Sequence, residues 1–381
     1  RKVKKRHIFF SISGYKKSGN QHVNEAISKG ASVIVSSKKI NYQKSKITYL
    51  IVKDVRESLS EACSNFYKKK PKNIIAVTGT NGKSSVADFF YQILNINKIS
   101  VASIGTLGII SKKYKKKNTL TSPDPLLLHK SLKILAKNKV NNVILEASSH
   151  GLKQKRLNHL NIKCGIFTNL SHDHLDYHKS MKSYFESKMY LFRKLLKPYS
   201  TVITDEENKE FKIIKNIPKI KKITIGLKSG NIKILENSYD ENNQIIKLLI
   251  NKKIFIQKIP LIGFFQIKNL LMAILAASSI GLNKIKILGQ LKKIRSVEGR
   301  LECVENLKNK SKIIIDFAHT PDALDKSLIA LKEQFNKKII LVFGCGGERD
   351  EKKRFQMGLI AKKYCRKIFV TDDNPRNENP K

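Results

Sequence analysis

The sequence predicts an α/β protein of three domains, in which the central domain is built on a mostly parallel sheet. Its 381 residues exceed the length that one compact core usually organises. In the middle of the chain, short apolar runs that end in polar residues alternate with helical patterns, as in a parallel sheet buried on both faces. Strand-like runs separated by helices resume after Gly299. The expected domains are residues 1–70, 71–298 and 299–381.

The first domain is expected to be a small α/β unit. Residues 7–14 and 31–37 have the composition of strands, and residues 20–30 have that of a helix ending at a glycine. The lysine-rich stretch 68–73 is expected to be a linker to the central domain.

The central domain begins with a strand that feeds a glycine-rich loop and a helix. The strand covers residues 74–78, and the helix runs from Lys83 to about Asn95. Three further short apolar runs are expected to be parallel strands: residues 142–149, 164–170 and 201–205. Because ligands of parallel sheets bind at the carboxyl ends of the strands, the site is expected there.

The rest of the chain predicts an antiparallel stretch, a helix and a further α/β domain. Residues 220–260 are β-rich, and residues 264–281 have helical spacing. Three strand-like runs follow, at residues 312–320, 338–347 and 367–375, with helices between them. The chain stops soon after the third run, so this Rossmann-like domain is expected to be incomplete.

The net charge of +45 raises the possibility of a nucleic-acid-binding protein. However, the lysines are spread along the whole chain and are not interleaved with aromatic residues, and runs such as 112–117 fall where loops are expected. We therefore expect lysine-rich solvated faces and no specific nucleic-acid partner, although non-specific adhesion at low salt would be unsurprising.

Cysteine usage and hydropathy indicate a protein of the reducing cytoplasm. The five cysteines lie far apart and form no CxxC pair, which argues against a disulfide framework and a zinc site. No apolar run approaches the roughly 20 residues that span a bilayer, so no membrane insertion is expected. The first residue is Arg1 and no signal-like segment follows, so the chain is expected to be a fragment.

The loop GTNGKSS, residues 79–85, is a candidate phosphate cradle. The common loop GxxxxGKS/T would place a glycine at position 77, where this chain has Val77, so a chance glycine turn is the alternative. The context favours phosphate, because glycines let backbone N–H groups approach it and the helix N-terminus adds positive charge. Lys83 would reach the β- and γ-phosphates, and the Ser84 hydroxyl would bind Mg²⁺.

Polar residues follow two other predicted strands. Glu146 ends one strand, and the segment TNLSHDHLDYH, residues 168–178, follows another. A carboxylate, a serine, a phosphate and one imidazole are a plausible set of ligands for Mg²⁺. Any single histidine here could equally be a surface residue, and the case for a site depends on the group.

These and further motifs resemble the Mur ligases over nearly the whole chain. The motifs, in the family's order, are GTNGKSS, EASSHGL, TNLSHDHLDYH, ESKMYLF, GFFQIKN, EGRLE, DFAHTPDAL and FGCGGERDEKKR. The resemblance implies that the glycine loop is the shorter ATP loop of this family and not a damaged one. It implies a three-domain Mur ligase architecture, with a nucleotide-sugar domain, an ATP domain and an amino-acid domain.

The resemblance also implies an activity, with ATP and two Mg²⁺ ions. In the family, ATP phosphorylates a substrate carboxylate and an incoming amine attacks the acyl phosphate. The implied catalytic residues are Lys83, Glu146, His174 and Lys188. The implied metal ligands are Ser84, Glu146, His174 and Lys188, the last carbamylated. The implied ATP-binding residues are Gly79, Thr80, Asn81, Gly82, Lys83, Ser84, Ser85, Asn269, Arg300, Asp316 and His319.

The substrate positions point to one branch of the family. Those for the nucleotide-sugar are Thr121, Ser122, Ser148, Gln154 and Arg156. Those for the amino acid are Arg354, Asp373, Asn374, Pro375 and Arg376. The DNPR pattern resembles members that add meso-diaminopimelate to UDP-N-acetylmuramoyl-L-alanyl-D-glutamate in peptidoglycan precursor synthesis. Arg376 would pair with the far carboxylate of diaminopimelate, and such a charged hydrogen bond is worth about 1.5–3 kcal/mol.

Several alternatives stay open. Within the superfamily, these are the ligases that add lysine or D-Ala-D-Ala and the folylpolyglutamate synthases. From other classes, they are a metal-dependent phosphohydrolase and the basic nucleic-acid binder. We expect a monomer with hinges near residues 70 and 298. The family's further motif GKGHE, beyond DNPR, is absent here, so weak or no ligase activity is expected of these 381 residues alone.

Overall fold

The computed structural model describes residues 3–14, 18–39, 46–240, 243–309, 311–348 and 351–379. Arg349 and Asp350 of the motif FGCGGERDEKKR, and Pro380 after DNPR, lie outside these residues. In this part of the chain no helix is long and apolar enough to cross a membrane.

The first unit is a small α/β unit, as the sequence predicts, and its sheet is parallel. The strands β1 (Ile8–Phe10), β2 (Val33–Ser36) and β3 (Thr48–Ile51) lie in the order β1-β2-β3 and pair in parallel. The short helices η1 (Gly19–His22) and α1 (Val23–Ser28) cover them, with Val23, Ala26 and Ile34 buried between. The strand β3 was not predicted.

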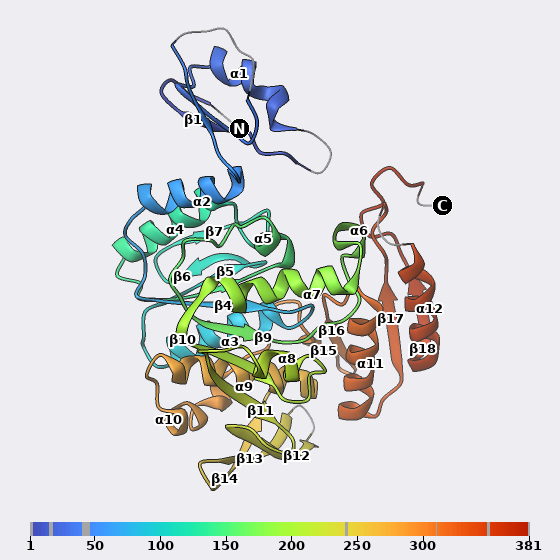
Figure 1. The fold of residues 1–381 in the computed structure, drawn as a ribbon. Coiled ribbons are helices and arrows are strands. Elements are labelled where there is room, and N and C mark those ends of the chain that lie inside the picture. The colour runs from blue at the N-terminus through green and yellow to red at the C-terminus, as the bar shows by residue number, and fades with distance from the viewer. Residues whose placement is uncertain are drawn as a thin grey trace.

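A helix that the sequence pattern did not predict, α2 (Val55–Phe66), follows the first unit but packs on the central one. Its N-terminus is capped by Asp54, whose carboxylate accepts from the backbone N–H groups of Arg56 and Glu57. The Ser60 hydroxyl donates to the Lys155 carbonyl at 2.5 Å. Figure 1 shows α2 beside α4, while the rest of the first unit stands apart.

The central unit is one long sheet with helices on both faces. Among the described residues, the strand order is β14-β13-β12-β11-β10-β9-β4-β8-β5-β6-β7. Neighbours pair in parallel from β5 through β8, β4, β9, β10 and β11 to β12, and in antiparallel fashion beyond both ends of that run. The bounds are β4 Asn73–Thr78, β5 Val101–Gly105, β6 Gly108–Ser111, β7 Lys115–Lys116, β8 Asn142–Glu146, β9 Ile162–Phe167, β10 Leu196–Asp205, β11 Lys221–Gly226, β12 Ile232–Asp240, β13 Asn243–Ile250 and β14 Lys253–Ile259.

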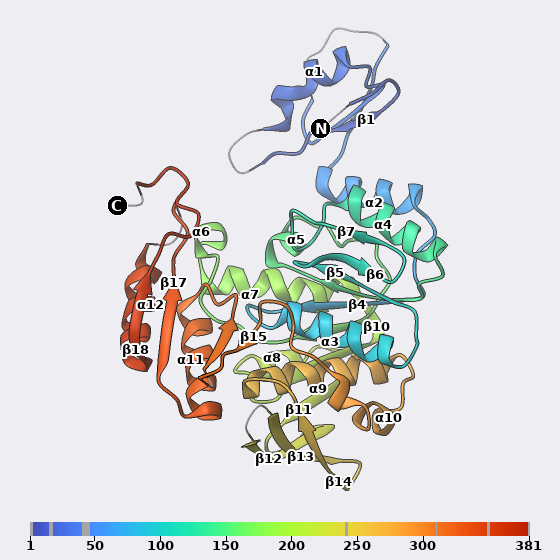
Figure 2. The same ribbon diagram turned by 180° about the vertical axis from the view of Figure 1, so that it is seen from behind.

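The parallel strands are buried on both faces, which explains why they read as continuous apolar runs. On β4, Ile75 and Val77 pack into one core with α3 (Lys83–Ile96) and α9 (Phe264–Ser279). Figure 2 shows these two helices side by side. The neighbours of Ile75 and Val77 on β4, Ile74 and Ala76, pack into the opposite core with α4 (Pro125–Lys137). The predicted β-rich stretch and the helix after it are confirmed as β11 to β14 and α9. The expected antiparallel pairing holds for β12 to β14 and is wrong for β11, which pairs in parallel with β10 and β12.

Shorter helices complete the central unit. They are α5 (Ser149–Lys153), α6 (Leu175–His178), α7 (Met181–Tyr190), the π-helix η2 (Leu191–Leu195), α8 (Phe211–Lys215), α10 (Lys284–Leu288) and η3 (Leu291–Lys293). One expectation is wrong in detail. The lysine run 112–117, expected as a loop, contains the two-residue strand β7, which pairs with β6 at the sheet edge.

The third unit contains the three predicted strands and one more. The strands β15 (Glu302–Asn306) and β16 (Lys312–Ile315) form an antiparallel pair, and β17 (Ile339–Phe343) pairs in parallel with β18 (Cys365–Val370). The helices α11 (Pro321–Phe335) and α12 (Lys352–Tyr364) pack on the second pair, with Leu324, Leu328 and Met357 buried between.

Candidate active site

A cavity of about 540 Å³ lies at the carboxyl ends of β4, β8 and β9, between the central and third units. This is the edge of the sheet where the sequence predicts the ligand site. The predicted residues that line it are Gly79, Thr80, Asn81, Gly82, Lys83, Ser84, Ser85, Thr121, Glu146, Ser148, His174, Lys188, Asn269, Arg300, Asp316 and His319. The structure therefore brings together all the predicted ATP, metal and catalytic positions, which come from segments far apart in the sequence.

The glycine loop has a shape that larger residues would break. Gly79 has φ +153°, and a Cβ there would lie 1.8 Å from the Thr168 hydroxyl. Gly82 has φ +84°, and its Cβ would lie 2.6 Å from the Asn269 side-chain oxygen. Asn169 holds the loop from the side, because its carbonyl accepts from the Thr80 N–H and its side-chain oxygen accepts from the Asn81 N–H, both at 2.9 Å.

Lys83 is the first residue of α3, at the positive end of that helix. Its ammonium donates to the Gly79 carbonyl at 2.9 Å and to the Thr80 carbonyl at 2.8 Å. Burial lowers the pKa of Lys83, and the carboxylate of Glu146 acts in the opposite direction. The Lys83 side chain thus lies over the glycine loop, so its ammonium is placed to contact a phosphate bound there.

Glu146 ends β8 and is almost fully buried. One carboxylate oxygen accepts from the Ser84 hydroxyl at 3.0 Å, which confirms that these two predicted residues meet. Both oxygens are also held by Thr106, through its backbone N–H at 2.8 Å and its hydroxyl at 3.2 Å. The sequence pattern gave no indication of Thr106, which follows β5.

His174 and Lys188 stand on the neighbouring segments α6 and α7. His174 caps α6 in a left-handed conformation, with φ +53°, and its ring nitrogen lies 3.3 Å from the Asp173 carboxylate. Burial lowers the pKa of His174. Lys188 is only 1% exposed, and its ammonium lies 4.1 Å from the ring centroid of Tyr184. Burial first, and then the charge of Lys83, hold the pKa of Lys188 well below its ordinary value.

The third unit closes the other side of the cavity. The Arg300 guanidinium lies 4.4 Å from the ring centroid of Phe317, and one of its nitrogens is 3.4 Å from the Ser84 hydroxyl. The Asp316 carboxylate accepts from the Leu301 N–H at 3.2 Å. Asn269 lies inside α9 and not at its cap, and its side chain donates to Gln266 at 3.1 Å.

The predicted nucleotide-sugar residues form a connected patch beside the cavity. The Ser122 hydroxyl donates to the Glu146 carbonyl at 2.7 Å and accepts from the Ser148 N–H at 2.9 Å. Arg156 donates to the Ser122 carbonyl and to the Gln154 side chain, both at 2.7 Å. Of this group, Thr121 and Ser148 line the cavity, whereas Ser122, Gln154 and Arg156 do not.

The predicted amino-acid residues lie elsewhere, on the loops after β17 and β18. Arg376 donates to the Gly347 carbonyl, and Arg354 donates to both carboxylate oxygens of Glu378, at 2.8 and 2.7 Å. Asn374 and Arg376 have left-handed backbones, with φ +48° and +56°. The residues of this group, Arg354, Asp373, Asn374, Pro375 and Arg376, do not line the cavity.

The donors in the cavity suit Mg²⁺ shared with a phosphate. Among the described residues, no three His, Cys, Asp or Glu side chains converge on a metal site. However, the Glu146 carboxylate and the Ser84 hydroxyl present neighbouring oxygens, and Mg²⁺ is usually held by one or two carboxylates plus phosphate oxygens and waters. The residues therefore fit a magnesium ion that enters with a nucleotide.

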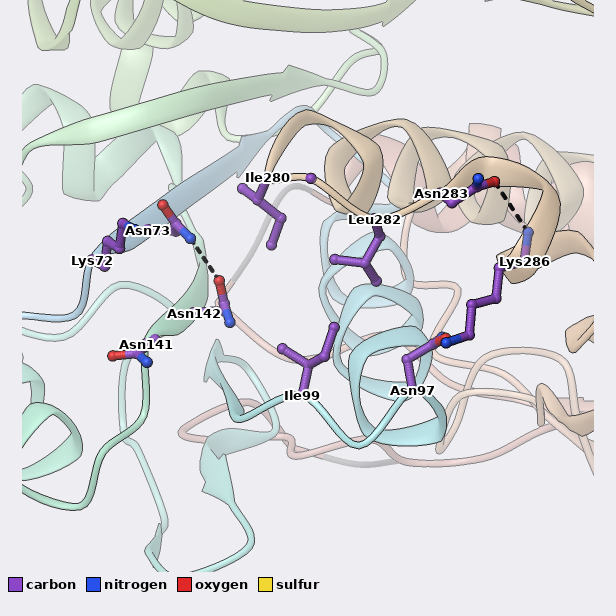
Figure 3. Close-up of a pocket in the computed structure, with 11 residues that line it drawn as sticks. Lys72, Asn73, Asn97, Ile99, Asn141, Asn142, Ile280, Leu282, Asn283 and Lys286 are labelled. Carbon is purple, nitrogen blue, oxygen red and sulfur yellow. Dashed lines mark hydrogen bonds between the residues drawn. The ribbon is translucent and has the colours of Figure 1, made fainter.

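A second cavity, of about 470 Å³, lies at the opposite ends of the same strands (Figure 3). Asn73 opens β4 and Asn142 opens β8, and their side chains share a hydrogen bond of 2.8 Å. None of the predicted site residues lines this cavity.

Comparison with known proteins agrees with this arrangement. Residues 77–277 match the Mur ligase middle domain, and residues 299–381 match the Mur ligase, glutamate ligase domain. The chain belongs to the Mur ligase family. A curated relative from Rickettsia montanensis, UDP-N-acetylmuramoyl-L-alanyl-D-glutamate--2,6-diaminopimelate ligase, is 39% identical over 100% of this chain and 80% of its own length.

Solved structures give the same result. A UDP-N-acetylmuramoyl-L-alanyl-D-glutamate--2,6-diaminopimelate ligase aligns over 100% of this chain and 78% of its own, with a TM-score of 0.77 and 30% identity. The MurF ligase from Thermotoga maritima, solved with ADP, shares the fold at a TM-score of 0.67 and 19% identity, covering 98% of this chain and 87% of its own. The predicted Mur ligase resemblance, the α/β architecture and the assignment to the ligases are confirmed.

Proposed function

We propose that this Mur ligase joins meso-diaminopimelate to UDP-N-acetylmuramoyl-L-alanyl-D-glutamate at the expense of ATP, in peptidoglycan precursor synthesis. The observation that carries the proposal is a match over the whole of this chain to relatives of that name, combined with a cavity that gathers the ATP-loop residues with Glu146 and Lys188. Among the rival ligases, solved structures of one that adds D-Ala-D-Ala and of a folylpolyglutamate synthase share the fold at only 17% and 14% identity.

The chemistry has two balanced steps. A carboxylate oxygen of the D-glutamyl residue attacks the γ-phosphorus of ATP, ADP leaves, and an acyl phosphate forms. The amine of diaminopimelate then attacks the acyl carbon, loses a proton, and expels inorganic phosphate to leave an amide. Lys83 and the backbone N–H groups of the loop would screen the phosphate charge, because they lie where the triphosphate must enter.

Four side chains would hold the metal ions: Ser84, Glu146, His174 and Lys188, the last as a carbamate. Bound Mg²⁺ supplies charge neutralisation for the transferring phosphoryl group. Burial lowers the pKa of Lys188, which favours the neutral amine, the form that reacts with CO₂. Asn269, Arg300, Asp316 and His319 would contact the nucleotide.

The remaining parts of the proposal concern organisation. The three domains are 1–70, 71–298 and 299–381, with α2 moving together with the central domain because it packs there. The protein is proposed to act in the cytoplasm as a monomer, without a nucleic-acid partner. The even spread of lysines along the whole chain supports the last point.

The proposal is tested by assaying the purified full-length protein with ATP, the nucleotide-sugar dipeptide and a panel of amine acceptors. Amide formation and ADP release should depend on meso-diaminopimelate and fall sharply with L-lysine or D-Ala-D-Ala. The Lys83→Ala variant should lose phosphate release, whereas a metal-dependent phosphohydrolase would retain it. Phosphate release without any acceptor, at an unchanged rate in Lys83→Ala, would refute the ligase proposal.

Arg376 gives a sharper prediction about the acceptor. Arg376→Ala should lower kcat/KM for meso-diaminopimelate by about 10- to 100-fold, the effect of one lost hydrogen bond between charged groups. Its kcat/KM for lysine should change little, because lysine lacks the second carboxylate. Arg366→Ala, at an exposed arginine on β18, is the matched control and should behave as the wild type. Equal losses for both acceptors would contradict the assigned role.

A further inference from the structure

The Glu146 carboxylate is held on one side by the end of β5. Its first oxygen accepts from the Thr106 backbone N–H at 2.8 Å, and its second accepts from the Thr106 hydroxyl at 3.2 Å. The second oxygen also accepts from the Ser84 hydroxyl at 3.0 Å. A single residue thus contributes two of the three side-chain or backbone donors that fix this carboxylate, and it does so from a strand adjacent to β8.

The residue before Thr106 is Gly105, and its lack of a side chain lets the β5 backbone lie close to the Glu146 carboxylate. A Cβ on Gly105 would lie 2.0 Å from the first carboxylate oxygen of Glu146 and 2.6 Å from its carboxyl carbon. Gly105 is therefore not a turn residue but a place where the backbone of β5 must approach the carboxylate closely. Gly105 and Thr106 together form a two-residue platform for Glu146.

The platform also reaches the segment that is proposed to take the nucleotide-sugar. The Thr106 hydroxyl lies 3.2 Å from the Thr121 hydroxyl. A hydroxyl has one proton to donate, so a Thr106 hydroxyl that donates to Glu146 must accept its second bond from Thr121. The resulting chain runs from Ser84 through Glu146 and Thr106 to Thr121, and all four residues line the same cavity.

We propose that Thr106 is a positioning residue, which fixes the Glu146 carboxylate for Mg²⁺–nucleotide and links it to the nucleotide-sugar segment through Thr121. This inference rests on the proposed function for the identity of the two ligands. A carboxylate that keeps its rotamer before the ligands arrive avoids reordering on binding. Thr106 acts through Glu146 and Thr121 and takes no part in bond making.

The test uses a series at position 106 that separates the hydroxyl from the backbone N–H. Thr106→Val removes only the hydroxyl at nearly constant shape, and Thr106→Ser keeps it. Gly105→Ala adds the methyl group that the carboxylate excludes. Thr201→Val, on β10 and away from the cavity lining, is the matched control.

Binding is measured by calorimetry with β,γ-methylene-ATP over a series of Mg²⁺ concentrations, beside steady-state kcat and KM. The Mg²⁺ concentration for half-maximal binding should rise about tenfold in Thr106→Val, the effect of one lost hydrogen bond to a charged group. Thr106→Ser should stay within about twofold of the wild type, Gly105→Ala should be at least as impaired as Thr106→Val, and melting temperatures should differ little. In a Thr106→Val/Thr121→Val double-mutant cycle on KM for the nucleotide-sugar, the two effects should not add.

A crystal structure of Thr106→Val without ligands gives a readout that needs no activity. The Glu146 carboxylate should turn away from its wild-type position. The inference is overturned if the carboxylate stays in place and the Mg²⁺ dependence of Thr106→Val matches that of the wild type. Failure of the proposed function looks different: the full-length wild-type protein would then form no amide with diaminopimelate, while the carboxylate position would still decide the role of Thr106.

Discussion

Lys188 is a residue of the active-site cavity whose burial is expected to destabilise the folded protein. In a composition with this many lysines, a helix lysine is expected to be solvated, yet Lys188 is 1% exposed. Its ammonium has a cation–π contact with Tyr184, and no ion pair or hydrogen bond from it is seen among the described residues. The Asp173 charge offsets only part of the burial, because the pKa of Lys188 stays well below its ordinary value. Removing a cation from water without a paired counter-charge is unfavourable, so a functional reason for its position is needed.

We predict that Lys188→Met stabilises the ligand-free protein and abolishes ligation. The folded-state pKa of Lys188 is lowered, so its unfavourable contribution is absent above its ordinary value of 10.5 and grows as the pH falls below that value. In CO₂-free buffer at pH 7, the free energy of unfolding should rise by about 1–3 kcal/mol. Urea denaturation at pH 7 and pH 10 measures this gain, which should shrink at pH 10.

The control for this prediction is on the same helix. Lys182→Met removes a lysine that is exposed on α7. This variant should change the free energy of unfolding by less than about 0.5 kcal/mol and should leave the activity unchanged. If Lys188→Met destabilised the protein at neutral pH, the burial argument for Lys188 would be wrong.

Some residues of the site could be predicted from the sequence and others could not. Lys83, Ser84 and Glu146 could be placed because a glycine loop and a strand end mark them. Thr106 could not, because its role depends on β5 lying beside β8, which pairs Ile104 with Leu145. An exposed threonine after a strand carries no signal of that pairing.

The glycine loop is the element whose geometry is most tightly constrained. We predict that Gly82→Ala loses nucleotide affinity by about 10-fold or more, because the new methyl would push against Asn269 and distort the loop. Gly281→Ala is the matched control, since Gly281 also has a left-handed φ, +106°, but no atom lies within 4 Å of the place that its new methyl group would occupy. Titration with an ATP analogue compares the two, and equal losses would show that backbone strain alone is responsible.

The helix α4 contains a buried histidine that should make the fold sensitive to acid. His129 is 0% exposed, and burial, with the nearby charges of Lys70 and His159, lowers its pKa from 6.5 to about 4. Between these values the unfolded chain binds the proton and the folded protein does not. The contribution of His129 to stability is therefore lost as the pH falls from about 6.5 to about 4.

We predict that His129→Leu reduces the acid sensitivity of the protein. Between pH 7 and pH 5, the wild type should lose about 1–2 kcal/mol more unfolding free energy than the variant. Denaturant unfolding at both values measures the difference. His7→Leu, at an exposed histidine of the first unit, should leave the pH dependence of the wild type intact. A parallel loss in His129→Leu would exclude His129 as the cause.

Among the elements, the buried strands were predictable and the marginal ones were not. The apolar runs of β4, β8 and β9 are continuous because both faces are covered. By contrast, β15 has only two apolar residues among its five and gives no such run, whereas β3 lies in the apolar stretch 47–52 and was missed although its pattern was readable. The helix α2 was missed although it has a clear N-cap at Asp54, and its packing on α4 could not be read from the chain.

At the scale of the whole molecule, the central and third units meet at the cavity and at a small apolar cluster that includes Ile262, Leu301 and Ala330. Arg300 reaches Ser84, and the Asn81 side chain donates to Asp322 at 3.2 Å. The part of the chain before α2 is linked to it by Arg56, which donates to the Ser13 carbonyl at 2.9 Å, while α2 itself is fixed to the central unit by contacts such as Arg56 to Gln154 at 3.3 Å. Small interfaces between units of one chain, with polar contacts beside a limited apolar cluster, allow the units to move relative to one another.

We therefore predict that an ATP analogue and the nucleotide-sugar together make the molecule more compact. The third unit would close on the nucleotide, and the first unit would approach the patch around Ser122 and Arg156, because each ligand bridges groups on two units. Small-angle scattering should show a smaller radius of gyration with both ligands than with neither. The Lys83→Ala variant should respond less to the ATP analogue, whereas Lys182→Met, with its exposed lysine removed, should respond fully. A radius that stays the same in the wild type with both ligands bound would mean that the cavity is already in its working shape, and that the hinges expected near residues 70 and 298 are not used.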